Sequence, residues 1–180
     1  MITTDLETAR ILLRPLSIAD AETIFNNWAH DLDVARYMNW NLHQSVKDTV
    51  EWLTLEEINI AKETNYTWGF VLKENQGLFG SGGINYNEEF EMFELGYCIM
   101  KKYWNLGLTT EAVKAILDFA VQKIGVVTFL GRHAKENPAS GKVLEKAGFI
   151  FQKEGKFSSF DGRRTFESKE YLFSVNSIIS

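Results

Sequence analysis

The sequence predicts an α/β (α+β) fold in which helices flank both faces of a mixed, mostly antiparallel central sheet. Three β-rich segments follow one another between residues 65 and 100, and the turn signal ENQG separates the first two, which favours antiparallel pairing. A strand–helix–strand unit follows over residues 90–134, and a crossover of this kind requires parallel pairing. The expected element order is β-α-α-β-β-β-α-β-α-β-β, in a single domain over residues 1–180.

The composition is that of an ordinary globular chain. With 180 residues, 45% hydrophobic and 13% aromatic, one aromatic-rich core is expected. No apolar run approaches the ~20 residues of a membrane span, and the polar start MITTDLETAR does not resemble a signal peptide. Cys98 is the single cysteine, so no internal disulfide is expected and the predicted location is cytoplasmic. The net charge of −5 argues against a nucleic-acid partner, and a monomer or homodimer is expected.

The N-terminal part is expected to form one strand and two helices. The run ARILLRPL predicts a strand that ends near Pro15, and SIADAETIFNNWAHD predicts a helix capped by Ser17 or Asp20. Residues 45–62 predict a second helix that begins with a Ser45–Asp48 capping box. Its apolar stripe would consist of Val46, Val50, Leu53 and Ile58.

The middle of the chain changes to strands. The segments 65–74, 78–87 and 90–100 read as strands, and the third ends almost continuously apolar, as a central strand does. Gly82 and Gly83 mark a bulge, a close ligand approach or only a bend. Residues 109–125 predict an amphipathic helix that ends at Gly125. Its inward face would consist of Ala112, Val113, Ile116, Leu117 and Ala120.

The C-terminal part is expected to form a strand, a helix and two further strands. Residues 126–134 are β-branched and aromatic, and the helix over 137–149 has Pro138 in its first turn and stops at Gly148. The last two strands lie in 149–175, around a turn at Asp161–Gly162.

The segment YWNLGLTTEA, residues 103–112, joins a strand to a helix through a turn that contains Gly107. The first N–H groups of a helix have no internal partner and carry partial positive charge, so such a site binds phosphate readily. Thr109 and Thr110 add hydroxyl donors. Neither a G-x-x-x-x-G-K-[ST] loop nor a G-x-G-x-x-G fingerprint is present. The segment by itself is therefore consistent either with a tight turn or with a phosphate site.

Two longer segments carry a family resemblance. ELGYCIMKKYWNLGLTTEAVKAILDFA, followed by ENPASGKVLEKAGF, resembles the GCN5-related N-acetyltransferases, most closely the branch of ribosomal-protein N-terminal acetyltransferases. TARILLRPLSIADAETIF, VARYMNW, SVKDTVEWL, GLFGSGGI and KEYLFSV fall in the order that this branch shows. The resemblance therefore covers nearly the whole chain.

The resemblance implies that acetyl-CoA is the acetyl donor. The family's loop signature maps onto residues 104–109, where Gly107 matches and where Asn105 and Thr109 depart from the smaller residues common there. The implied donor-binding residues are Ile99, Trp104, Asn105, Gly107, Leu108, Thr109, Thr110, Asn137 and Ser140. Ile99 would lie against the pantetheine arm, Asn137 would hydrogen-bond that arm, and Ser140 would lie near the thioester sulfur.

Acetyl transfer to an amine needs a neutral amine, an oxyanion donor and a proton for the thiolate. Glu94 is the candidate base because it begins the strand that would carry the pantetheine arm; alternatively, it is a solvated or salt-bridged carboxylate. A backbone N–H near Cys98 or Ile99 would stabilise the oxyanion. The tyrosine that many relatives use as proton donor is Leu144 here, which leaves Ser140 as candidate donor or as a hydroxyl that satisfies its own helix turn.

The remaining candidates for site residues are three aromatic residues, the cysteine and the histidines. Tyr37 and Trp40, together with Trp52, line an acceptor pocket by resemblance, or they are core aromatics. Cys98 is expected to be buried and unreactive. The three histidines have no metal-ligand spacing, so no metal is expected.

The predicted function is transfer of an acetyl group from acetyl-CoA to a primary amine, directly, in a ternary complex. The acceptor would be a peptide N-terminal amine or a small-molecule amine. One alternative is a catalytically weak CoA-binding sensor or interaction module of the same fold, and another is a phosphate-binding domain unrelated to CoA.

Overall fold

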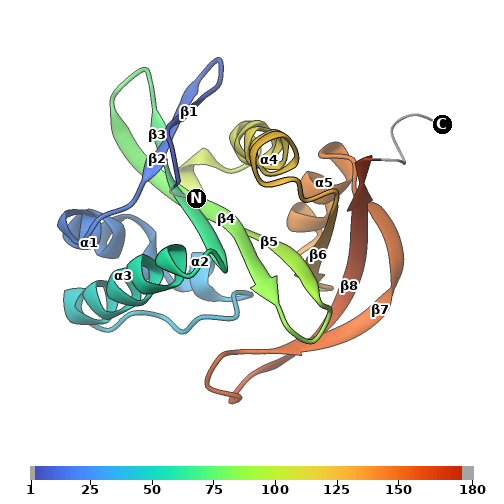
Figure 1. The fold of residues 1–180 in the computed structure, drawn as a ribbon. Coiled ribbons are helices and arrows are strands. Elements are labelled where there is room, and N and C mark those ends of the chain that lie inside the picture. The colour runs from blue at the N-terminus through green and yellow to red at the C-terminus, as the bar shows by residue number, and fades with distance from the viewer. Residues whose placement is uncertain (1–2, 176–180) are drawn as a thin grey trace.

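The computed structural model describes residues 3–175, and an eight-stranded sheet forms its centre (Figure 1). The sheet order is β1-β2-β3-β4-β5-β6-β8-β7. The strands are β1 (Leu6–Glu7), β2 (Ile11–Pro15), β3 (Asn65–Leu72), β4 (Gly77–Asn87), β5 (Met92–Ile99), β6 (Thr128–Ala134), β7 (Ile150–Ser158) and β8 (Thr165–Ser174). Each neighbouring pair is antiparallel except β5 and β6. The mixed, mostly antiparallel sheet that the sequence predicts is confirmed.

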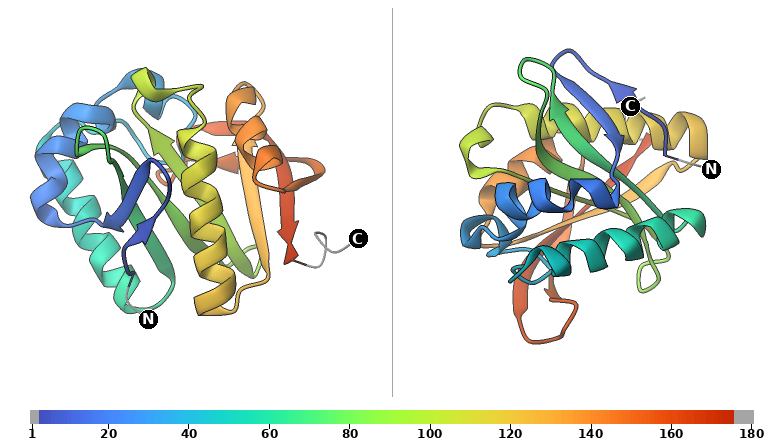
Figure 2. Two further views of the ribbon diagram at one scale, coloured as in Figure 1. Left: turned by 90° about the horizontal axis from the view of Figure 1, so that it is seen from above. Right: turned by 90° about the vertical axis from the view of Figure 1, so that its left-hand side faces the viewer.

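The helices cover both faces of the sheet (Figure 2). On one face lie α1 (Ala21–Ile24), the short α2 (Leu32–Ala35) and α3 (Val46–Ala61). On the other lie α4 (Leu108–Phe119) and α5 (Pro138–Lys146), and α4 packs on β2, β4 and β5. Each face has its own hydrophobic cluster.

Local sequence signals explain where several helices begin and end. The Ser45–Asp48 capping box is present at the start of α3. The five inward residues expected on α4 and its extension are buried, and Gly125 adopts the left-handed conformation that ends this helical segment. Pro138 occupies the first turn of α5, where its missing N–H costs nothing.

The structure corrects four details. The two-residue strand β1 adds an eighth strand that the predicted order lacks. The expected helix over residues 17–31 is divided into a 3₁₀ turn, α1 and a π turn, and α2 follows it. Ile58, assigned to the buried stripe of α3, is 46% exposed, because only a narrow face of this helix packs on the sheet. Of the three alternatives for Gly82 and Gly83, the bulge is wrong, because the register shift between β3 and β4 lies between Phe70 and Val71.

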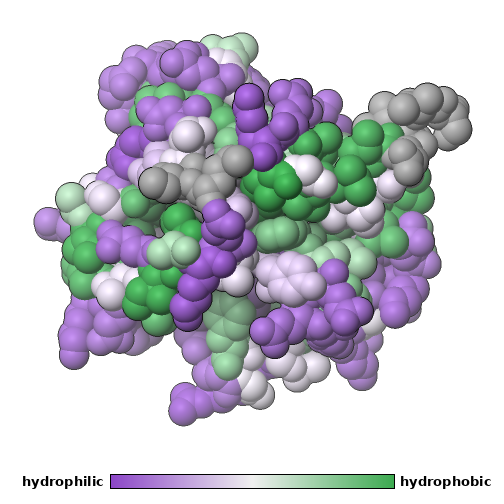
Figure 3. Space-filling view, in the orientation of Figure 1, coloured by the Kyte–Doolittle hydropathy of each residue, from purple (hydrophilic) through white to green (hydrophobic). Residues whose placement is uncertain are grey.

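The surface in the orientation of Figure 1 is hydrophilic over much of its area, with apolar side chains gathered in patches (Figure 3). Leu55 and Ile58 on α3 are among the large apolar side chains with high exposure. Within residues 3–175, no helix is long and apolar enough to cross a membrane.

Candidate active site

The sheet opens between β5 and β6. The two strands pair only from Phe93 to Leu95 on β5 and from Phe129 to Gly131 on β6. Beyond these residues, β5 stays paired with β4 and β6 stays paired with β8, so the two strands diverge. The facing edges of residues 96–99 and 132–134 therefore have no strand partner across the opening, and their backbone groups can bind an extended ligand.

A cavity of about 680 Å³ passes through this opening. Its lining comes from both faces of the sheet, because Trp52 and Glu56 belong to α3 whereas Ser140 belongs to α5. Five predicted site residues line it together, although they are scattered along the sequence: Tyr37, Trp40, Glu94, Asn137 and Ser140. The other predicted residues, from Ile99 to Thr110, lie at the C-terminal end of β5 and the start of α4.

The turn between β5 and α4 is shaped by two left-handed residues. Asn105 has φ +63° and Gly107 has φ +74°. Asparagine and glycine are the two residues that most readily adopt this conformation, so Asn105 preserves a turn in which the family often has glycine. The indole Nε1 of Trp104 donates a 3.1 Å hydrogen bond to the carbonyl of Ile99 and so ties the turn to the strand.

Gly107 is the N-cap of α4, and no side chain caps this end of the helix in the described structure. The first-turn N–H groups of Leu108, Thr109 and Thr110 precede the first i→i−4 bond, which Glu111 donates to Gly107. These groups and the helix dipole therefore form a binding site suited to a phosphate or pyrophosphate.

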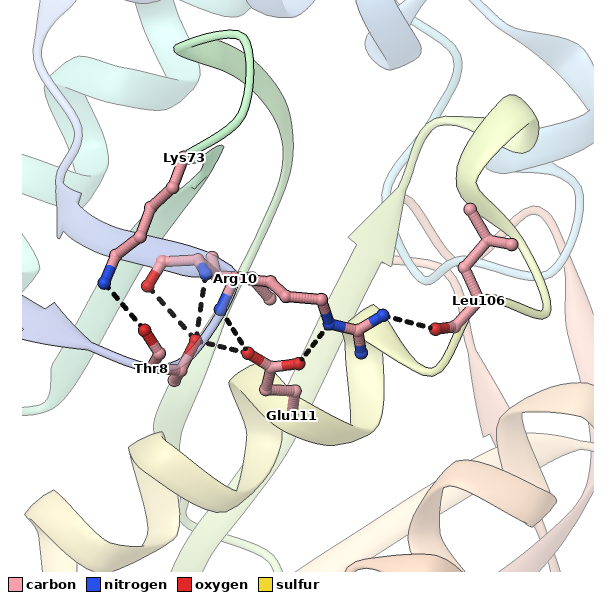
Figure 4. A network of polar contacts seen from close by, with 6 residues as sticks. Thr8, Arg10, Lys73, Leu106 and Glu111 are labelled. Atoms are coloured by element: carbon pink, nitrogen blue, oxygen red, sulfur yellow. Dashed lines mark hydrogen bonds and ion pairs between the residues drawn. The ribbon is translucent and has the colours of Figure 1, made fainter.

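A polar network holds this turn against the connection between β1 and β2 (Figure 4). The Arg10 Nη1 donates to the carbonyl of Leu106 at 3.0 Å, and its Nε donates to Glu111 at 2.7 Å. Thr8 Oγ1 donates to the other oxygen of Glu111 at 2.6 Å, and Lys73 Nζ donates to the carbonyl of Thr8 at 2.7 Å. Burial alone would raise the pKa of Glu111, but the hydrogen bonds from Thr8 and Arg10 outweigh it and lower that pKa. Glu111 is therefore a charged anchor of the turn.

We expect Gly107→Ala to weaken acetyl-CoA binding while the protein stays folded. The added Cβ would meet only Arg10 Nη2, at an ordinary 3.6 Å, so strain rather than collision decides the result. A left-handed alanine costs about 1–2 kcal/mol, and relief of this strain would move the first-turn N–H groups. Calorimetric titration with CoA should show about a tenfold weaker Kd. The matched control is Gly125→Ala, which has the same backbone geometry at the far end of the helical segment and should leave the Kd unchanged.

The start of α5 places Asn137 and Ser140 at the cavity. The side chain of Asn137 does not cap its own helix and remains available to a ligand. The Ser140 hydroxyl lies 2.9 Å from that of Tyr97, which also donates to the Ser140 carbonyl at 2.9 Å. Leu144 is buried in the core, as its apolar side chain requires.

Tyr97 is a site residue that the sequence analysis missed. It lines the cavity from β5, and burial raises its pKa, so it carries its proton at neutral pH. The available signal was its place on the expected pantetheine strand, but the hydroxyl of Ser140 comes from a residue 43 positions away, and only the fold shows that they meet.

Glu94 is held by an ion pair. Arg132 Nε and Nη2 donate to its two oxygens at 2.8 and 2.9 Å, and Asn87 Nδ2 donates to Oε2 at 2.7 Å. The Arg132 side chain is 11% exposed and lies over the ring of Phe90 at 5.0 Å. The carboxylate lines the cavity and is salt-bridged, as the structural alternative for Glu94 expects. Its role as a base stays a prediction.

Tyr37 and Trp40 lie on the loop after α2, at the cavity wall. Trp40 and Trp52 also pack against the cluster beneath α1 and α3, as the core alternative expects. The acceptor-binding role of Tyr37 and Trp40 stays a prediction. A distant arginine fixes this loop: Arg164 donates to the carbonyls of Ala35, Arg36, Met38 and Trp40 and to Asn41 Oδ1, at 2.6–3.4 Å.

Cys98 has no features of a nucleophile. Burial raises its pKa to about 11, so the thiol is protonated at neutral pH, and its sulfur lies 3.7 Å from the Ser81 hydroxyl. Among residues 3–175, no group of three or more His, Cys, Asp and Glu side chains is arranged to hold a metal ion.

Comparison with known proteins places this geometry in a family. A model of the acetyltransferase (GNAT) domain matches residues 10–150. The chain belongs to the GNAT acetyltransferase family. This confirms the family, the fold class and the acetyltransferase class that the sequence predicts.

Relatives of this GNAT chain are consistent with that assignment. The uncharacterized N-acetyltransferase p20 of Bacillus licheniformis is 25% identical over 172 residues, which cover 94% of each chain. The structure of RimL, a ribosomal L7/L12 alpha-N-protein acetyltransferase in complex with coenzyme A, has a TM-score of 0.83 at 11% identity and covers 97% of this chain and 99% of its own. That of the Microcin C7 self-immunity acetyltransferase MccE, in complex with acetyl-CoA and AMP, has a TM-score of 0.80 at 14% identity, covering 93% and 94%. The two structural likenesses establish the fold alone.

Proposed function

We propose that this GNAT chain transfers the acetyl group of acetyl-CoA to a primary amine, directly, in a ternary complex. The observation that carries the proposal is the placement of three features along β5: the strand separates from β6, its residues 96–98 line the cavity, and it leads through a turn to the uncapped start of α4. The start of α4 binds phosphate, and the opening between β5 and β6 accommodates an extended arm. The cavity has room for an acceptor on the opposite face of the sheet. RimL and MccE, which share the fold, were solved with CoA and acetyl-CoA.

Each residue has a role in this proposal. The first-turn N–H groups of α4 bind the pyrophosphate, and Asn137 hydrogen-bonds the pantetheine arm. The free edge of β5 near Cys98 and Ile99 supplies the N–H for the oxyanion. Ser140 donates a proton to the departing thiolate and regains one from solvent, and the Tyr97 hydroxyl, which donates to the Ser140 carbonyl, orients Ser140. Glu94 accepts the proton of the amine, directly or through water.

Turnover of a panel of amines tests the function. Purified protein is incubated with acetyl-CoA and peptides, polyamines or aminoglycosides, and the products are identified by mass spectrometry. Acetylated products would support the enzyme, and Asn137→Ala should then raise the KM for acetyl-CoA. Calorimetric CoA binding without turnover of any amine would support the sensor alternative, and binding of ATP but not CoA would support an unrelated phosphate-binding domain.

We expect Glu94→Gln to lower kcat about 100-fold near neutral pH, and less at higher pH. Lysine and α-amino groups have pKa values of about 10.4 and 8, so an amine needs a base at neutral pH but loses its proton unaided at high pH. The measurement is a kcat profile across pH. Glu88→Gln is the matched control, because it removes the same charge from the cavity lining.

A purely structural Glu94 would give a different result. Removing one partner of an ion pair that is mostly shielded from solvent destabilises a protein, so Glu94→Gln would then lower the melting temperature and leave the shape of the pH profile unchanged. A profile parallel to that of the unsubstituted enzyme would exclude the base role.

A further inference from the structure

Glu56 is a carboxylate in the cavity that has no cationic partner in the described structure. It extends from α3 and lines the cavity beside Trp52 and Thr67. Thr67 Oγ1 donates to its Oε2 at 2.6 Å, and Asn65 Nδ2 donates to its Oε1 at 3.2 Å. No ion pair of residues 3–175 includes it. Glu94, in the same cavity, is neutralised by Arg132.

Glu56 is oriented, but its charge is not balanced. Burial raises its pKa, and hydrogen bonds from Thr67, Asn65 and Trp52 offset this only in part. A carboxylate has about four acceptor positions, and the hydrogen bonds from Thr67, Asn65 and Trp52 leave about one of them open to a ligand. A partly buried charge without a counter-ion is costly, so a cationic ligand would be bound favourably here.

The sheet register gives the distance between Glu56 and the opening. Thr67 on β3 pairs with Gly83 on β4, which pairs with Gly96 on β5. Neighbouring strands lie about 4.8 Å apart, so Glu56 contacts the floor of the cavity roughly 10 Å from Gly96. The two intervening positions nearest the opening are glycines, and a Cβ at Gly96 would meet nothing within 4 Å. An unbranched chain therefore has room to lie across this floor.

We propose that Glu56 binds a second cationic group of the acceptor, so that the acceptor is an aliphatic polyamine with a second ammonium roughly 10 Å from the acetylated amine. This rests on the proposed function. The aromatic side chains at the cavity wall suit the same ligand, since Tyr37, Trp40 and Trp52 can pack on methylene groups and attract cations through their ring faces. An acceptor with a single amine, in contrast, would leave the Glu56 carboxylate without a counter-ion.

The test compares two amines that differ by one charge. Initial rates with diaminooctane and octylamine give kcat/KM for each. The unsubstituted enzyme should prefer the diamine by about tenfold or more, as expected for a hydrogen bond to a charged group. Glu56→Gln should abolish that preference through a higher KM for diaminooctane, with the KM for octylamine and acetyl-CoA unchanged. Diaminobutane, which is too short to span the distance, should behave like a monoamine in both proteins.

The control variant is Glu57→Gln, which removes the same charge from the exposed neighbouring position on α3 and should keep the preference. Three outcomes would overturn the proposal. The unsubstituted enzyme could use the two amines equally, Glu56→Gln could keep the preference for the diamine, or Glu57→Gln could lose that preference as well. Calorimetric titration of diaminooctane in the presence of CoA separates this result from failure of the proposed function. Tighter binding to the unsubstituted protein than to Glu56→Gln supports the site even without turnover, and equal or no binding contradicts it.

Discussion

We expect Gly96→Val to abolish acetyl transfer without unfolding the protein. Gly96 lies on β5 where the sheet begins to open, and a Cβ there would meet no atom within 4 Å. Its φ is not in the left-handed region, so no local conformation requires glycine. Glycine in a strand interior is a weak choice, and valine is a favourable strand residue. The open space lies over the cavity floor, so a branched side chain would occupy the position of the reacting groups.

The expected loss in kcat/KM is at least about 100-fold, because a displacement of about 1 Å at a reacting centre is sufficient for an effect of that size. The melting temperature should stay the same or rise. Gly96→Ala, which adds one methyl group, should give an intermediate loss. Full activity in Gly96→Val would show that the acceptor does not approach over this residue.

Gly83 provides the contrasting case on the neighbouring strand. A Cβ at Gly83 would lie 2.0 Å from the carbonyl oxygen of Tyr66 and 2.9 Å from the Cα of Thr67, so the backbone of β3 would have to move. Gly83→Ala should therefore destabilise the protein by about 1–3 kcal/mol or more. Gly83 and Gly96 pair with each other on neighbouring strands, but their substitutions are expected to have different effects. Packing requires glycine at position 83, and space for the substrate requires it at position 96.

We expect Arg164→Ala to raise the KM for the acceptor about tenfold or more and to leave the KM for acetyl-CoA unchanged. The guanidinium holds four backbone carbonyls of residues 35–40, and this loop carries Tyr37 and Trp40. Hydrogen bonds to charged groups contribute about 1.5–3 kcal/mol each, so their loss would leave the loop disordered in the free protein. The acceptor would then have to order the loop on binding, whereas the acetyl-CoA site proposed at the start of α4 is built from other residues.

The measurement is the pair of KM values, with limited proteolysis within residues 35–41 as a readout of loop order. Arg164→Lys should recover little, because an ammonium group lacks the planar fork that reaches several carbonyls. The control is Arg163→Ala: this neighbour is exposed and pairs only with Asp161 among the described ion pairs. Equal increases in both KM values, or no change in either, would contradict a specific role in positioning the loop.

The hairpin turn that carries Arg164 is itself ordered by a carboxylate. Asp161 accepts from the Ser159 hydroxyl at 2.6 Å and from the Arg163 N–H at 3.0 Å, and these hydrogen bonds lower the pKa of Asp161 to about 2. The Phe160 N–H donates to the carbonyl of Asn39 at 2.8 Å, so Phe160 and Arg164, both at the turn between β7 and β8, contact the loop of residues 35–41. The turn signal DG was visible in the sequence, but its contact with residues more than 120 positions away was not.

The sequence by itself determined the features that depend on neighbouring residues. The capping box of α3, the apolar face of α4 and its end at Gly125, and the start of α5 at Pro138 each follow from side chains within a few positions of one another. The left-handed turn before α4 belongs to this group, because Asn105 and Gly107 are residue types that adopt it. The family resemblance then predicted the fold and the donor, and it supplied the candidate residues for both ends of the proposed site.

Only the tertiary structure decided which side chains act on one another. Glu94 meets Arg132 across 38 positions, Tyr97 meets Ser140 across 43, and Arg164 meets the loop of residues 35–41 across more than 120. Glu56 faces the cavity only because α3 packs over Thr67 of β3. The divergence of β5 from β6 likewise depends on which neighbour each strand keeps. Such contacts arise from the packing of distant elements, and local spacing carries no information about them.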